Sequence, residues 1–136
     1  MALIRTIAVG FDGSPDSETA LNWAVDLAKQ ARADLAVVHA IGLLEHASDP
    51  AHVVELEQMA RTVARERGIE SERLHWHAVD GDPCSTLIRT AGAPILADLV
   101  VVGSRGQSSH AGLLLGSTGL ELAEHLVIPL VIVPTG

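Results

Sequence analysis

Five short runs of apolar, largely β-branched residues, separated by segments with helical periodicity, constrain the fold of this chain most strongly. The runs cover residues 3–11, 35–41, 73–79, 98–103 and 129–134. Apolar side chains recur at helical spacing in each of the four intervening segments. Strands joined by crossover helices run parallel, with right-handed connections. We therefore predict one α/β domain over residues 1–136, a doubly wound five-stranded parallel sheet with four helices.

Residue types at the segment ends predict where helices begin and which strand is peripheral. Asp16 or Ser17 is expected to cap the first helix. Asp82, with Pro83 behind it, is expected to start the third. Apolar and polar side chains alternate along residues 73–79, which favours an edge strand with one more polar face.

Composition limits the partners that this chain can take. The formal net charge is −8 and the pI about 5.2, which argues against a nucleic-acid surface because phosphate backbones are bound by clustered Lys and Arg. No segment approaches the length of a membrane span, so we expect no membrane association. The single cysteine, Cys84, cannot form an internal disulfide and is expected to be a small apolar residue near a helix start. These features favour a cytoplasmic protein.

A glycine-rich stretch, GSRGQSSHAGLLLGST at residues 103–118, directly follows the fourth predicted strand. Glycine allows positive φ and a close approach of backbone or ligand, so the loop amides can turn inward around a bound group. Ser117 and Thr118 stand where a helix begins, and the free N–H groups and helix dipole there favour an anion. The stretch therefore indicates phosphate binding.

The spacing within this stretch is that of a known motif. Gly103, Gly106, Gly116 and Ser117 reproduce the pattern G-x2-G-x9-G-[ST], which resembles the ATP-binding members of the universal stress protein family. The segment VGFDGS, the His39–Ala40 pair, the Ala97–Asp98 pair and the closing PLVIVP are also similar to that family. The resemblance implies strand order 3-2-1-4-5, ATP or AMP as ligand, and a homodimer paired through residues 130–133.

The loops after the first and fourth strands are expected to flank one ligand site, because ligands of such sheets bind beyond the carboxyl ends of the strands. Asp12 is then either a turn residue or a group that meets the ribose or a phosphate-bound Mg²⁺. Arg105 is either a solvated loop residue or a bidentate phosphate ligand. The resemblance implies that the Ala40 backbone bonds adenine. The predicted nucleotide-binding set is Gly10, Phe11, Asp12, Ser14, Ala40, Gly103, Ser104, Arg105, Gly106, Gly116, Ser117 and Thr118.

The histidines are expected to have structural roles. His39 is expected to be a satisfied core or sheet histidine rather than a ligand. His75 and His77 share one face of a strand but lack a carboxylate or cysteine partner at zinc spacing, so no metal site is expected from side-chain clusters.

These observations favour a protein that senses or carries adenine nucleotide during stress, with at most slow hydrolysis, since no nucleophile and base stand out. A Walker A loop needs a lysine that is missing beside these glycines, and a Rossmann fingerprint would follow the first strand, where this chain has GFDGSP. The alternatives are an AMP or cyclic AMP carrier, a nucleotide-independent dimeric interaction module, and an ATP-consuming enzyme.

Overall fold

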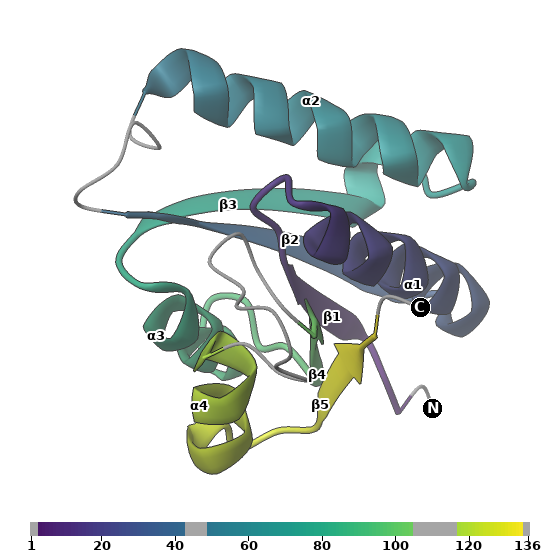
Figure 1. Cartoon of the computed structure of the whole chain (residues 1–136). Helices are drawn as coiled ribbons and strands as arrows, with labels where there is room; N and C mark the ends of the chain where they lie inside the picture. Colours follow the sequence, from purple (N-terminus) through teal and green to yellow (C-terminus); the bar gives the residue numbers. More distant parts are fainter. Residues whose placement is uncertain (1–2, 43–48, 105–116, 135–136) are drawn as a thin grey trace.

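A computed structural model describes residues 3–42, 49–104 and 117–134 of the chain. Within them, five parallel strands form one sheet in the order β3-β2-β1-β4-β5 (Figure 1). The strands are β1 (Thr6–Gly10), β2 (Asp34–Ile41), β3 (Leu74–Asp80), β4 (Leu99–Gly103) and β5 (Leu130–Val133). The helices are α1 (Pro15–Ala31), α2 (Pro50–Glu66), α3 (Pro83–Ile88) and α4 (Ser117–His125), with 3-10 turns at Ser71–Arg73 and Arg89–Ala91. The predicted fold class and strand order are confirmed.

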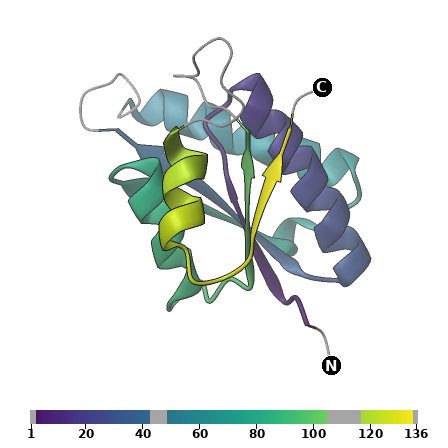
Figure 2. The ribbon, with the colours of Figure 1, turned by 60° about the horizontal axis from the view of Figure 1, so that its bottom comes forward.

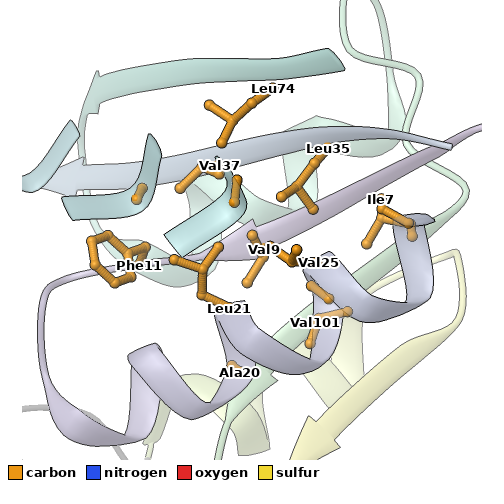
Figure 3. Close-up of a cluster of buried hydrophobic side chains, with 14 of the residues drawn as sticks. Ile7, Val9, Phe11, Ala20, Leu21, Val25, Leu35, Val37, Leu74 and Val101 are labelled. Atoms are coloured by element: carbon orange, nitrogen blue, oxygen red, sulfur yellow. The ribbon is translucent and has the colours of Figure 1, made fainter. Parts of the chain in front are cut away.

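Helices cover both faces of the sheet, as the nearly continuous apolar strands require. α1 and α2 lie on one face, where Val9, Val37 and Val101 point into a core shared with both helices (Figure 3). α3 and α4 lie on the other, against Ala8 and Val100 (Figure 2). Successive strand residues therefore belong to two separate cores, one on each side of the sheet.

The direction of winding reverses beside β1. Val9 of β1 is in register with Val37 of β2 on one side and with Val101 of β4 on the other. The chain winds outward from β1 to β3 and then crosses to β4, so the carboxyl ends of β1 and β4 are neighbours. This is the place where a doubly wound sheet binds its ligands.

The predicted boundaries agree with the structure to within three residues, but the predicted cap of the first helix is wrong. α1 is capped by Ser14, whose Oγ accepts the Ser17 N–H at 3.2 Å, and Pro15 takes the first helical position. Proline fits there because it has no N–H to leave unpaired. Ser17 thus lies inside the first turn and is buried.

The start of α3 is as predicted. Asp82 accepts the Ser85 N–H at 2.9 Å, and Pro83 follows the cap. This backbone hydrogen bond is the main cause that lowers the pKa of the Asp82 carboxyl. The helix tightens into a 3-10 turn at Arg89–Ala91 before Gly92.

Asp98 links β1 and β4 at their amino ends. Its Oδ2 accepts the N–H groups of Arg5 at 2.9 Å and Thr6 at 3.1 Å, and its own N–H donates to the Thr6 carbonyl. The Ala97–Asp98 pair therefore has a structural role at the end of the sheet opposite the predicted site.

β3 is an edge strand, as its alternating pattern predicted. Leu74 and Trp76 pack toward the core beneath α1 and α2, while His75 is exposed. None of the described helices combines the length and hydropathy that a bilayer crossing requires.

Replacing Arg73 by alanine is expected to lower the free energy of unfolding by about 1.5 kcal/mol. Arg73 Nη2 donates to the carbonyl oxygens of Ala28 and Ala33, at the carboxyl end of α1. The guanidinium thus joins the carboxyl end of α1 and the residue before β2 to the chain entering β3. Urea unfolding followed by circular dichroism measures the change.

Arg67→Ala is the matched control for this substitution. Arg67 pairs with Asp26 at 2.8 Å, but both side chains are exposed, and such pairs contribute about 0 to 1 kcal/mol. Equal losses in the two variants would show that the contacts of Arg73 with the two carbonyls contribute no more than a surface ion pair.

Candidate functional site

The turn after β1 is built by short local hydrogen bonds. Gly13 has φ +83°, a conformation that side chains disfavour. The Asp12 Oδ1 accepts the Ser14 N–H at 2.9 Å, and the Ser17 Oγ accepts the Asp12 N–H at 3.3 Å and donates to the Ser14 carbonyl. These bonds hold Asp12 at the carboxyl end of β1, directly before α1.

α2 also restrains this turn. A Cβ atom at Gly13 would lie 2.7 Å from the Leu56 Cδ2, so the Leu56 side chain of α2 packs directly against the glycine. Leu56 is itself buried. The position therefore requires glycine for two reasons, its φ and the contact with α2.

β4 ends against the first turn of α1. A Cβ atom at Gly103 would lie 2.6 Å from the Asp16 carbonyl oxygen and 2.8 Å from its carbonyl carbon. The turn containing Asp12 and the start of the glycine-rich stretch are thus brought together by direct backbone packing. Ser104, which follows, is buried and its N–H donates to the Val133 carbonyl at 3.1 Å, so this amide already has an acceptor.

Gly10 and Phe11 make packing contacts at the end of β1. A Cβ at Gly10 would lie 3.1 Å from the Leu87 Cδ1 of α3. The Phe11 ring is buried in the core under α1 and α2 (Figure 3), and its N–H donates to the Val38 carbonyl at 2.9 Å. Both residues fix the path of the chain into Asp12.

β2 contributes Ala40 and His39 to the same edge of the sheet. Ala40 is in register with Val79 of β3 and is half-buried. His39 is 3% exposed; its Nδ1 lies 3.0 Å from the Phe11 carbonyl oxygen, and its ring stacks on Trp76. The interpretation of His39 as a satisfied core or sheet histidine needs correction, since none of the described residues is a hydrogen-bond partner for Nε2.

The rest of the predicted set lies in or beside the glycine-rich stretch. Arg105, Gly106 and Gly116 lie outside the described residues. Ser117 and Thr118 are the first two residues of α4. Of the predicted residues in this stretch, the structure therefore describes those at its two ends, Gly103 with Ser104 and Ser117 with Thr118.

Other titratable groups lie away from this edge or serve packing. Burial is the main cause that raises the pKa of the Cys84 thiol, with Glu121 adding to it, and burial followed by the charge of His75 lowers the pKa of His77. His75 Nε2 lies 3.5 Å from the Asp34 Oδ2. Within the described parts of the chain, no group of three His, Cys, Asp or Glu side chains is placed to hold a metal ion.

Comparison with known protein families matches residues 3–134 to the model of the universal stress protein family. This chain belongs to that family. The match spans every described strand and helix, so it covers the whole sheet and the predicted site.

Two relatives differ in how much of their own length this chain spans. The universal stress protein Rv2623 of Mycobacterium tuberculosis is 31% identical over 93% of this chain, and the chain spans only 44% of that protein. The universal stress protein YxiE of Bacillus subtilis is 26% identical over 96% of this chain and 99% of its own length.

A universal stress protein solved in complex with cAMP is similar in both sequence and fold. It is 31% identical to this chain, the alignment covers 96% of each chain, and the TM-score is 0.77. The resemblance therefore extends over the full doubly wound sheet.

The sequence reasoning missed three contributors to this edge. Gly13 was given no role of its own, whereas its contact with Leu56 joins α2 to the site. Ser17 was considered only as a helix cap, and it instead holds the Asp12 amide. The bond of His39 to Phe11 joins residues 28 positions apart, so no local pattern reveals it.

Proposed function

We propose that this universal stress protein binds an adenine nucleotide at the carboxyl edge of β1, β2 and β4, and acts as a sensor or regulatory protein in the stress response. The observation that carries the proposal is the likeness, at 31% identity over 96% of both chains, to a family member solved in complex with cAMP. The motif G-x2-G-x9-G-[ST] in this sequence and the packing of Gly103 on α1 support the same position.

The proposed roles follow the chemistry of the nucleotide. Asp12 meets the ribose or a nucleotide-bound Mg²⁺, and the Ala40 backbone hydrogen-bonds adenine. The phosphates bind to the glycine-rich stretch and the start of α4, where amides and the helix dipole favour an anion. The residues proposed for the phosphates are Gly103, Ser104, Arg105, Gly106, Gly116, Ser117 and Thr118.

Two observations favour different adenine nucleotides. ATP with Mg²⁺ is favoured by the motif, which resembles that of the ATP-binding members, whereas cAMP is favoured by the complex of the similar protein. Native mass spectrometry of the purified protein, followed by calorimetry with ATP, AMP and cAMP with and without Mg²⁺, distinguishes these ligands. GTP serves as the control for base recognition. Absence of binding to every adenine nucleotide would refute the proposal and favour an interaction module.

We further propose that the protein forms a homodimer through β5. β5 is the other edge strand of the sheet, and an uncovered edge of Leu130–Val133 offers backbone groups to a second copy. Light scattering coupled to gel filtration tests the stoichiometry, and a monomer at high micromolar concentration would contradict it. A cytoplasmic location is our expectation from the single cysteine, and cell fractionation tests it.

A further inference from the structure

The peptide unit between Phe11 and Asp12 is the last part of the chain before the proposed nucleotide site. The Phe11 N–H still belongs to the sheet, because it donates to the Val38 carbonyl at 2.9 Å. The next carbonyl and amide, Phe11 C=O and Asp12 N–H, have left the strand ladder. Their orientation determines the direction in which Asp12 departs from the sheet.

Two side chains hold this single peptide unit from opposite ends. His39 Nδ1 of β2 lies 3.0 Å from the Phe11 oxygen, and the Ser17 Oγ of α1 lies 3.3 Å from the Asp12 nitrogen. A rotation of the peptide plane would break both hydrogen bonds. The unit is therefore clamped between the strand and the helix that flank it.

The bond to Phe11 identifies the nitrogen of His39 that acts as the donor. A carbonyl oxygen only accepts hydrogen bonds, so Nδ1 carries the proton and donates it. The other ring nitrogen, Nε2, is buried and has no hydrogen-bond partner among the residues that the structure describes. The ring is held in place by stacking on Trp76, with centroids 6.1 Å apart and planes at 17°. An apolar side chain at position 39 would avoid burying the unpartnered Nε2. What histidine adds, and an apolar residue cannot, is the hydrogen bond from Nδ1 to the Phe11 carbonyl.

We propose that His39 is a positioning residue for nucleotide binding, which acts by donating its Nδ1–H to the Phe11 carbonyl and so orients Asp12. The inference rests on the proposed function. His39 itself does not contact the nucleotide in this account. Its effect passes through one backbone peptide.

Asparagine and leucine variants separate the hydrogen bond from simple packing. Asparagine places its Nδ2 where histidine has Nδ1 and keeps the donor, whereas leucine fills the space without one. We expect His39→Leu to weaken adenine-nucleotide binding about tenfold, and His39→Asn to stay within about threefold of the parent. Calorimetry measures both affinities. Val25→Ala, a buried change on α1, is expected to lower stability while leaving the affinity unchanged, and so controls for destabilisation.

A second measurement does not depend on nucleotide. Nitrogen-15 NMR of the unliganded parent should show a proton on Nδ1 of His39. If the leucine variant does not fold, His39→Gln replaces it, because the glutamine amide reaches the position of Nε2 and not that of Nδ1.

The outcomes are distinguishable. A parent that binds no adenine nucleotide refutes the proposed function and this inference with it. A parent that binds, with the leucine or glutamine variant equally tight, overturns the positioning role alone. An asparagine variant as weak as the leucine variant, or a ring that carries no proton on Nδ1, overturns it as well.

Discussion

Replacing Gly103 by alanine should lower the free energy of unfolding by about 3 kcal/mol, the upper range for overpacking a filled site. The added Cβ would meet the Asp16 carbonyl oxygen at 2.6 Å and the carbonyl carbon at 2.8 Å. These are backbone atoms in the first turn of α1, so no side-chain rotation relieves the clash. α1 would have to move away from β4. Urea unfolding without nucleotide measures the loss.

Gly42→Ala is the matched control, because no atom of the described residues lies within 4 Å of a Cβ built at that glycine. It is expected to be neutral or to stabilise by a few tenths of a kcal/mol, through a smaller entropy of the unfolded chain. An alanine at position 103 that costs no more than the one at position 42 would contradict the close packing of β4 on α1. The same packing joins the two loops of the proposed site, so the variant should also lose nucleotide affinity.

The fold could be predicted because its main signals are local. Apolar, largely β-branched runs, such as 99–102, alternate with helical patterns, and a parallel sheet with helices on both faces is the arrangement that buries them all. The cap of α3 was predictable for the same reason, since Asp82 and Pro83 are adjacent in sequence. The cap of α1 was not, because several residues between 12 and 17 are good caps and only the packed turn selects Ser14.

The site was predictable in outline from topology. Asp12 and Gly103 were expected at one edge because the carboxyl ends of adjacent parallel strands meet there, and the structure places β1 and β4 side by side. What could not be predicted is the set of contacts between distant segments. Glycine at 103 predicted the close approach of either backbone or ligand, but not that the backbone would be that of Asp16 in α1.

Replacing Gly106 or Gly116 by glutamate should weaken adenine-nucleotide binding by at least about 100-fold while leaving the fold intact, since two or more charge-assisted hydrogen bonds to phosphate would be lost. Both glycines occupy fixed positions of the motif, and both lie outside the described residues. A glutamate fills the loop with a side chain and adds a negative charge beside the phosphates. Calorimetry with the nucleotide that the parent binds measures the effect, and circular dichroism checks the fold.

Two controls separate the causes of this loss. Ser109→Glu adds the same charge to the same stretch of sequence at a position that the motif leaves variable, and a loss of no more than about tenfold is expected from charge alone. Gly106→Gln adds nearly the same volume without charge, so it measures the steric part. If the glutamate variants bind as tightly as the parent, the phosphates do not lie in the glycine-rich stretch. Asp12 and Ala40 would then face a ligand held in some other way, and the anion site at the start of α4 would have to be abandoned.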